Sequence, residues 1–379
     1  MTTILGISEE RADLREMLWD LLSQQSSPEQ VHRIVDSGDA NDPSLDAALA
    51  ELGLVGIDAP EDLGGGGGGV SHLRHVAEGC GWSTAATRLL GTSAAMGALL
   101  ASDATDAREQ WVPRLADGSA AGAVALPGVF GGDRGDHVTA QYDNGSLRLS
   151  GTVSNIVDLP VASIAVVLAH TEEGRAALAL VELDSPGATV ARLEALDLTR
   201  TIGSLELDGA RATLLAGADA ASAAVEAIVQ RASLVLAADS LGIAARVVEV
   251  TVEYAKQREQ FDRPIGSFQA VKHQAADMLT RTEMARALVD EAAHALEESR
   301  SDAALLVSMA KDLACGTSAW VAGRGIQLHG GIGYTWEHEM HIYFKRAKLN
   351  EMLFGDRRWH RGRIIELTRA QRGNHEEKH

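Results

Sequence analysis

Seven short apolar segments lie in the middle of the chain, between two long stretches of helical periodicity. Turn signals such as Asp143-Asn144-Gly145 separate them. Their spacing predicts a small antiparallel β-barrel or sandwich. The segments are 121–126, 137–142, 146–151, 162–169, 176–183, 188–193 and 204–207. Few soluble folds place one compact β-domain between two sets of helices, so this order limits the possible architectures strongly.

The flanking stretches are predicted to be helical because apolar residues recur at spacings of three and four, as in Leu14, Leu18 and Leu22. The second stretch contains four predicted helices, and 379 residues exceed the roughly 250–300 that one core can hold. We therefore predict an α+β chain with a helical domain, a β-domain and a C-terminal four-helix bundle. The domains are 1–120, 121–216 and 217–379, and the four helices are about 220–256, 268–296, 302–328 and 337–369.

Charge and cysteine content exclude several classes of function. The chain has 34 Lys and Arg against 53 Asp and Glu, a net charge of −19, which disfavours binding to nucleic acid or an anionic membrane. No apolar run approaches the roughly 20 residues of a membrane span. Cys80 and Cys315 are too few for a disulfide framework, so we expect a cytoplasmic protein. His338 and His341 lack a second ligand cluster, so no metal site is predicted.

Two segments carry candidate chemistry. Residues 254–269 place Arg258 and Arg263 around a turn between helices, where guanidinium groups can bind a pyrophosphate. Residues 327–338 place Gly330-Gly331-Ile332-Gly333 before a helix start, where backbone N–H groups favour phosphate. From pattern alone, plain turns between helices with solvated charges are the favoured interpretation of both segments.

These segments closely resemble the acyl-CoA dehydrogenase family, whose signatures are Arg-x-x-Phe-Gly-x-x-Ile-x-x-Phe-Gln and Gln-x-x-Gly-Gly-x-Gly. Residues 196–200 and 275–278 extend the resemblance over nearly the whole chain. The resemblance implies FAD at a subunit interface and oxidation of an acyl-CoA thioester to the 2,3-enoyl-CoA. It also implies a tetramer and an electron-transferring flavoprotein as acceptor.

The resemblance assigns cofactor residues one by one. The first signature implies FAD contacts, partly to a neighbouring subunit, and the second implies a further cofactor segment. Asp262 departs from the pattern, because the family has glycine there. The implied cofactor residues are Arg258, Gln260, Phe261, Gln269, Gln327, Gly330 and Gly331.

The reaction requires a carboxylate base in a dry site. Most family members carry it in a Glu-Gly pair on the final helix, where this chain has Phe354-Gly355. A second branch places glutamate where this chain has Ala232. A third group, which resembles actinobacterial steroid-side-chain enzymes, has Ala-Ala-Glu-x-x-Gly where this chain has Asp239.

Asp239 is therefore the leading base candidate, and it is the sole charge between residues 234 and 244. We expect burial to raise its pKa. Two alternatives stay open: a structural carboxylate paired with an arginine such as Arg246, or a base supplied by Glu351.

The expected flavin wall also departs from the family, at residues 123–129 and 153–156. These departures resemble heteromeric actinobacterial acyl-CoA dehydrogenases, in which two dissimilar chains share each FAD site. Our first hypothesis is a catalytic subunit for a bulky acyl-CoA such as a steroid side-chain thioester. The second is a catalytically silent partner subunit, so a homotetramer and a heterotetramer both remain open. A third hypothesis is an oxygen-using flavoenzyme, either an acyl-CoA oxidase or a nitroalkane oxidase. The chain length argues against the acyl-CoA oxidases, which are longer.

Overall fold

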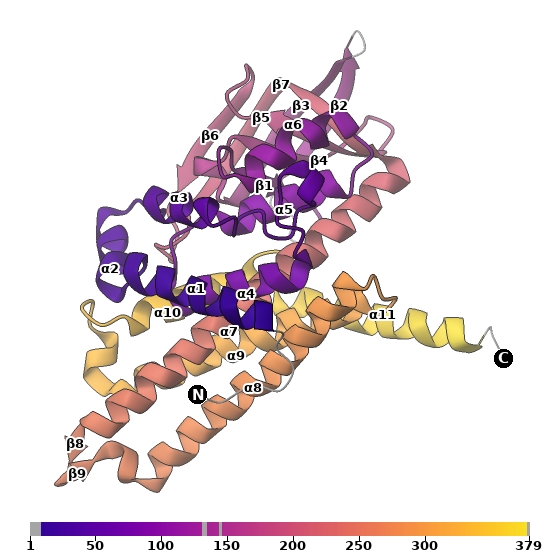
Figure 1. Ribbon diagram of the computed structural model, residues 1–379. Coiled ribbons are helices and arrows are strands. Elements are labelled where there is room, and N and C mark those ends of the chain that lie inside the picture. The colour runs from indigo at the N-terminus through magenta and orange to yellow at the C-terminus, as the bar shows by residue number, and fades with distance from the viewer. Residues whose placement is uncertain (1–8, 131–134, 144–145, 377–379) are drawn as a thin grey trace.

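The computed structural model describes residues 9–130, 135–143 and 146–376. Helices from both ends of the chain surround a long bundle, and the β-domain lies at one end of that bundle (Figure 1). The element order is helices, strands, helices, which confirms the predicted α+β class. A hairpin at the opposite end of the bundle, labelled β8 and β9, lies farthest from the β-domain (Figure 1).

The N-terminal helices begin where the sequence offers capping side chains. Ser27 and Gln30 form a capping box at the start of α2. The Asp42 carboxylate accepts from the backbone N–H of Ser44 and Leu45 at 3.0 and 3.2 Å and starts α3. The elements are α1 (Glu9–Gln25), α2 (Pro28–Ser37), α3 (Pro43–Glu51), η1 (Glu61–Leu63), α4 (Gly69–Trp82), α5 (Leu89–Leu100) and α6 (Thr105–Ala116).

The β-domain is a closed barrel. Strands β4, β2, β3, β7 and β5 pair in a ring that the β4–β5 pairing completes, while β1 joins β4 and β6 joins β7. Each of the seven predicted segments is a strand, and most pairs are antiparallel as predicted, but β1–β4 and β2–β4 pair in parallel. The β2–β3 hairpin provides the connection that such pairing needs. The strands are β1 (Gly122–Ala125), β2 (His137–Asp143), β3 (Ser146–Val157), β4 (Ile164–His170), β5 (Ala176–Glu182), β6 (Ala188–Leu193) and β7 (Ile202–Gly217), with η2 (Leu159–Val161) after β3.

The C-terminal region is a helical bundle with one helix more than predicted. The expected last helix is interrupted at residues 353–356, where Phe354 and Gly355 have φ of 52° and 96°. The second half, α11, projects beyond the bundle (Figure 1). The elements are α7 (Ala218–Gln257), β8 (Glu259–Gln260), β9 (Arg263–Pro264), η3 (Ile265–Ser267), α8 (Gln269–Glu297), α9 (Ala303–His329), η4 (Gly330–Tyr334), α10 (Met340–Met352) and α11 (Arg357–Glu376).

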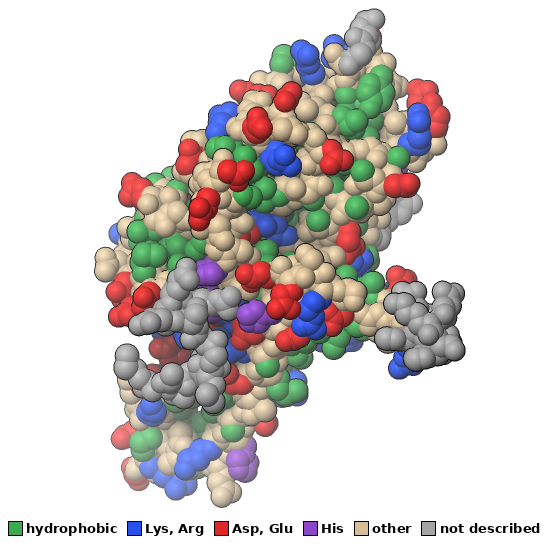
Figure 2. All heavy atoms as spheres, turned by 45° about the vertical axis from the view of Figure 1, so that its right-hand side comes forward, with side chains coloured by type: hydrophobic (Ala, Val, Ile, Leu, Met, Phe, Trp, Pro, Cys, Tyr) green, Lys and Arg blue, Asp and Glu red, His purple; other side chains and the backbone are tan. Residues whose placement is uncertain are grey.

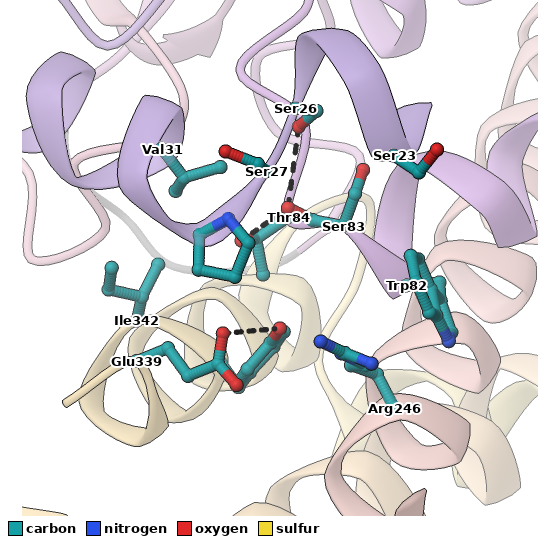
Figure 3. Close-up of a pocket in the computed structure, with 12 residues that line it drawn as sticks. Ser23, Ser26, Ser27, Val31, Trp82, Ser83, Thr84, Arg246, Glu339 and Ile342 are labelled. Carbon is teal, nitrogen blue, oxygen red and sulfur yellow. Dashed lines mark hydrogen bonds between the residues drawn. The ribbon is translucent and has the colours of Figure 1, made fainter. Parts of the chain in front are cut away.

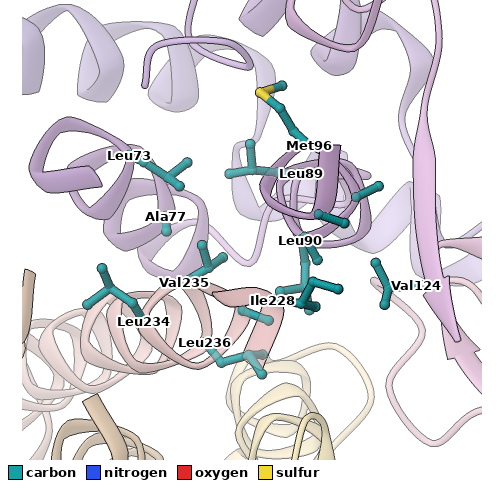
Figure 4. Packing of buried hydrophobic residues seen from close by; sticks show 14 of the residues in the cluster. Leu73, Ala77, Leu89, Leu90, Met96, Val124, Ile228, Leu234, Val235 and Leu236 are labelled. Atoms are coloured by element: carbon teal, nitrogen blue, oxygen red, sulfur yellow. The ribbon is translucent and has the colours of Figure 1, made fainter. Parts of the chain in front are cut away.

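Small residues allow the central helices to pack closely. A Cβ on Gly81 of α4 would lie 1.9 Å from the Asp239 carbonyl oxygen of α7, and one on Gly242 would lie 1.9 Å from the Glu78 carbonyl oxygen. The two backbones therefore touch, which explains why an aromatic-poor, alanine-rich chain forms a dense core. Apolar side chains of α4, α5, α7 and β1 pack together in the core (Figure 4).

Acidic side chains are spread over the molecular face in Figure 2 rather than gathered in one patch. This distribution agrees with the net charge of −19. In the part of the chain that the structure describes, no helix is long and apolar enough to span a membrane.

Candidate functional site

A cavity of about 510 Å³ lies between the barrel and the turn that joins α10 to α11. We call it the barrel–helix cavity. Three segments that the sequence singled out line it together: the end of β1 and the residues after it (124–128), the β3 segment 153–157, and the α10–α11 turn with Phe354. Its volume suits a ligand of cofactor or substrate size.

The barrel wall is shaped by a bulge in β3. The pairing of β3 with β7 shifts register between Val153 and Ile156, and Asn155 adopts a left-handed φ of 59°. A bulge redirects side chains out of the strand alternation. Ser154 and Asn155 consequently supply neutral polar groups to the cavity.

The opposite wall contains Phe354, in the position where the family resemblance would place a glutamate. Its ring is 8% exposed and makes an edge contact with Phe130 at 5.9 Å between centroids. Phe130 in turn contacts Trp359 of α11 at 5.3 Å. A phenyl ring accepts no proton, so this wall offers an aromatic surface where a base is expected.

The charges around the barrel–helix cavity are all acidic among the described residues. Asp136, Glu194 and Asp356 line it, and no lysine or arginine does so. Sequence reasoning missed these three carboxylates. Only Asp356 could have been noticed in the sequence, because it lies two residues after Phe354, where the family carries its base. Its carboxylate also accepts from the backbone N–H of Trp359 at 2.8 Å and so caps α11.

Asp239 lies outside the cavity lining, in a fully buried cluster of charged and polar groups. Arg346 donates to both of its carboxylate oxygens, at 2.6 and 3.2 Å, and Arg200 donates at 3.0 Å. The Asn350 amide donates at 2.7 Å. Arg346 also donates to the Ala85 carbonyl and the Thr199 hydroxyl, so it joins all three regions of the chain.

The expected raised pKa of Asp239 is wrong. Burial by itself raises the pKa, but the two guanidinium groups and the Asn350 amide outweigh burial, and the pKa of Asp239 is lowered. The expected partner was also wrong. Arg246 instead stacks over Trp82 at 4.4 Å and lies 3.4 Å from Glu249. The base role of Asp239 stays a prediction, and its surroundings count against it.

Arg246 lines a second, smaller cavity of about 140 Å³ (Figure 3). The α1–α2 turn, the end of α4 and the start of α10 enclose it, and serine hydroxyl groups face it from the α1 side. Glu339 accepts from the Tyr343 hydroxyl there at 3.4 Å. Burial raises the pKa of Glu339 despite the nearby Arg246.

The remaining base candidates lie elsewhere. Glu351 is buried at the end of α10, forms an ion pair with Lys348 and does not line the barrel–helix cavity. Ala232 is buried inside α7. Among the described residues, no group of three or more His, Cys, Asp or Glu side chains is arranged to hold a metal ion.

The residues of the first signature lie on the exposed β8–β9 hairpin. Phe261 is 87% exposed, and both Phe261 and Asp262 adopt left-handed φ, of 54° and 61°. Positive φ at both central residues is the geometry of a type I′ turn, which explains why glycine suits the Asp262 position. The guanidinium of Arg263 lies 4.1 Å from the Phe268 ring centre. Arg258, at the foot of the hairpin, is exposed too.

This hairpin lies at the end of the bundle opposite the β-domain (Figure 1). Arg258 follows the last residue of α7, about 28 Å along that helix from Asp239 at 1.5 Å per residue. Gln260 and Gln269 are likewise exposed. The structure therefore separates the predicted base from the predicted cofactor contacts of the same chain, and the cofactor role of these residues stays a prediction.

The second signature forms the turn at the end of α9. Gln327, Gly330 and Gly331 are exposed, and nothing lies within 4 Å of a Cβ built on either glycine. Gly330 has φ 65° and ψ −140°, a conformation open essentially to glycine alone. Tyr254, one turn before Arg258, stacks on His329 at 4.3 Å and donates to the His329 carbonyl at 3.3 Å. The two signatures are thus joined at one end of the bundle.

The exposed residues of the two signatures fit the diphosphate and rings of an FAD. The exposed Arg258 offers a guanidinium, the open glycine turn offers unobstructed backbone, and the exposed Phe261 offers a ring face. All three lie on the exposed surface of this chain.

Comparisons with known proteins agree with this architecture. Residues 8–119 match the acyl-CoA dehydrogenase N-terminal domain, and residues 208–367 match the acyl-CoA dehydrogenase C-terminal domain. The acyl-CoA dehydrogenase IpdE2 of Mycobacterium tuberculosis is 36% identical over 340 residues, covering 89% of this chain and 91% of the relative.

Two solved structures are similar over nearly the whole chain. The ChsE4–ChsE5 complex from Mycobacterium tuberculosis has a chain 30% identical, with a TM-score of 0.86 over 96% of this chain and 98% of that one. A variant of the Tcur3481–Tcur3483 steroid ACAD is 29% identical, with a TM-score of 0.86 over 96% and 99% of the two chains. With both domain models matched and a relative above 30% identity, this chain belongs to the acyl-CoA dehydrogenase family.

Proposed function

We propose that this chain is a subunit of a heteromeric, FAD-dependent acyl-CoA dehydrogenase. In this role it completes the flavin site of a second family chain and supplies no catalytic base. The observation that carries the proposal is the state of Asp239, whose carboxylate is engaged by Arg346, Arg200 and Asn350. The position where most family members carry the base is Phe354 in this chain.

A general base needs a free lone pair and a pKa near the working pH. Asp239 has neither, because two guanidinium groups hold it and its pKa is lowered. Proton removal from Cα therefore falls to a carboxylate of the second chain. When bound, FAD supplies the hydride acceptor of the reaction.

The residues of this chain would act on the neighbour's cofactor. Arg258 would neutralise diphosphate charge, while Gln260 and the backbone at Gly330 and Gly331 would donate hydrogen bonds. Phe261 would cover a ring face and exclude water. Their exposure on one end of the bundle supports this assignment.

The relatives and solved structures support a bulky acyl-CoA as substrate, since one similar structure is a steroid ACAD. The paired chains of the ChsE4–ChsE5 complex support a partner of the same family, and a family relative is a subunit of an Etf complex. We accordingly include an electron-transferring flavoprotein as acceptor in the proposal. Two buried, free cysteines support a cytoplasmic location.

The proposal is tested by the visible spectrum of purified protein. The chain alone is expected to be colourless, and the complex with its partner chain is expected to hold one FAD per pair of chains. Acyl-CoA should bleach the flavin band of that complex. A homotetramer that holds one FAD per chain and bleaches with acyl-CoA would refute the proposal.

A second candidate function, a self-sufficient catalytic subunit, is favoured by one observation. Asp356 lines the barrel–helix cavity beside Phe354 and carries a carboxylate. In such an enzyme Asp356→Asn would abolish bleaching while flavin stayed bound, whereas in the proposed partner subunit it would leave bleaching unchanged. Glu194→Gln, which changes another carboxylate of the cavity lining, is the matched control.

A further inference from the structure

Lys311 of α9 is a buried cation that has no part in the proposed function. Its side chain is only 2% exposed. Its ammonium group donates to the Asn350 carbonyl at 2.7 Å and reaches the Gly355 carbonyl at 3.5 Å. A buried ammonium group is unfavourable unless it is hydrogen-bonded, so packing alone does not account for lysine here.

Both carbonyls belong to the α10–α11 turn and the helix end before it. Asn350 lies in the last turn of α10, where a cation also meets the negative end of the helix dipole. Beyond it, Phe354 adopts φ 52°, which a bulky side chain rarely occupies. His360 of α11 donates through Nε2 to the Phe354 carbonyl at 3.1 Å. The turn is therefore held in an unfavourable backbone conformation by buried polar groups.

Asn350 connects this arrangement to the Asp239 cluster. Its side-chain amide donates to Asp239 at 2.7 Å and lies 3.1 Å from the Ser240 hydroxyl, while its carbonyl accepts from Lys311. One residue of α10 is thus bound from α7 through its side chain and from α9 through its backbone.

We propose that Lys311 is the positioning residue for the α10–α11 turn, acting with Asn350 and Asp239. It keeps residues 353–356 in the conformation that places Phe354 against the barrel–helix cavity. The consequence for a ligand in that cavity rests on the proposed function, but the positioning itself does not. Asp239 accordingly contributes to the site by fixing a wall rather than by accepting a proton.

The test measures backbone hydrogen exchange by mass spectrometry in the full chain, with its partner chain present. Lys311→Met removes the charge and keeps the length of the side chain. Exchange of the amides at 353–356 should rise roughly 10-fold or more, because the local opening becomes more favourable. Lys348→Met, on α10 rather than α9, half-exposed and paired with Glu351, is the control and should leave these amides unchanged.

A second background separates positioning from general loss of stability. In Phe354→Gly the left-handed φ carries no strain, so Lys311→Met should accelerate exchange less than about 3-fold there. An equal effect in both backgrounds, or unchanged exchange in Lys311→Met alone, would overturn the proposal. If Lys311→Met does not fold, Lys311→Gln takes its place, because its amide is uncharged and its side chain is one bond shorter.

The flavin spectrum of the same samples keeps the two proposals apart. The expected exchange pattern in a complex that never binds flavin would refute the proposed function and leave the role of Lys311 standing. Normal flavin content with unchanged exchange in Lys311→Met would refute only the positioning role.

Discussion

Arg346 donates two hydrogen bonds to the buried Asp239 carboxylate, from Nη2 to Oδ2 at 2.6 Å and from Nε to Oδ1 at 3.2 Å. Both side chains are at most 3% exposed. Such a bidentate pair holds the carboxylate in its charged form, because protonation would leave a guanidinium buried without a counter-ion. Asp239 is thereby a structural anion at the junction of the three regions of the chain.

We expect Asp239→Asn to lower the free energy of unfolding by about 3–5 kcal/mol, because it leaves two buried guanidinium groups without a charged counter-ion. Urea denaturation measures this loss. Asp302→Asn, which breaks an exposed pair with Arg300, should cost at most about 1 kcal/mol. In the folded complex flavin bleaching should persist, because Asp239 fixes a cavity wall and accepts no proton. A loss of about 10²–10⁴-fold in that rate would instead establish Asp239 as the base.

Arg258→Ala should weaken retention of FAD by the complex about 10- to 100-fold, since a hydrogen bond to a charged group contributes roughly 1.5–3 kcal/mol. Equilibrium dialysis with flavin fluorescence measures the change. Arg175→Ala, on an exposed barrel hairpin, is the matched control and should leave retention as it was. Equal retention in both variants would remove the β8–β9 hairpin from the flavin site.

Two glycine substitutions should have opposite effects on stability. Gly242→Ala places a methyl group where the Glu78 carbonyl lies 1.9 Å away, so α4 and α7 must separate. We expect a loss of at least about 2 kcal/mol, as for other overpacked cores. Gly362→Ala, on α11 with nothing within 4 Å, should gain about 0.5–1 kcal/mol from helix propensity. Thermal melting of both variants tests the pair, and a stable Gly242→Ala would contradict the close helix contact.

Asp158 should make stability depend on pH between about 4 and 6. Burial raises its pKa to about 6, although Arg200 and the Gly91 N–H oppose the rise. The folded chain binds this proton more tightly than the unfolded chain, whose aspartate pKa is about 3.9, so stability falls as pH rises through this window. Asp158→Asn removes that loss. The free energy of unfolding of Asp158→Asn, taken relative to that of the native chain, should therefore rise by about 2 kcal/mol from pH 4 to pH 7.5.

Chemical denaturation at the two pH values checks this prediction for Asp158. Asp208→Asn, at an exposed position of β7, serves as control and should show no comparable change. The same pH dependence in native chain and Asp158→Asn would show that the carboxylate does not titrate in this window.

The sequence predicted the strands and long helices because those depend on local apolar spacing. It missed the break at residues 353–356, since the residues leading into it, such as Leu349 and Met352, favour helix and only Gly355 interrupts them. The break depends on Lys311, which approaches from another helix. A tertiary contact of this kind leaves no local pattern.

The candidate site was predictable only in part, because its contacts also join residues that lie far apart in the chain. The family resemblance singled out three segments that line one cavity, but it gave no account of the partners of Asp239. Arg200 and Arg346 lie far from Asp239 in the chain, and each looks in the sequence like an ordinary surface arginine. Only folding shows that both are buried against one carboxylate.

The outward direction of the β8–β9 hairpin has a genetic consequence under the proposed function. A harmful allele affecting Arg258 or Phe261 would leave this protein folded and abundant, while the cofactor would be missing from the product of a different gene. The mutation would map to the gene of this chain, while the missing cofactor would be detected in the partner protein. The two genes would then have to be expressed in equal amounts, because an excess of either product has no complement to serve.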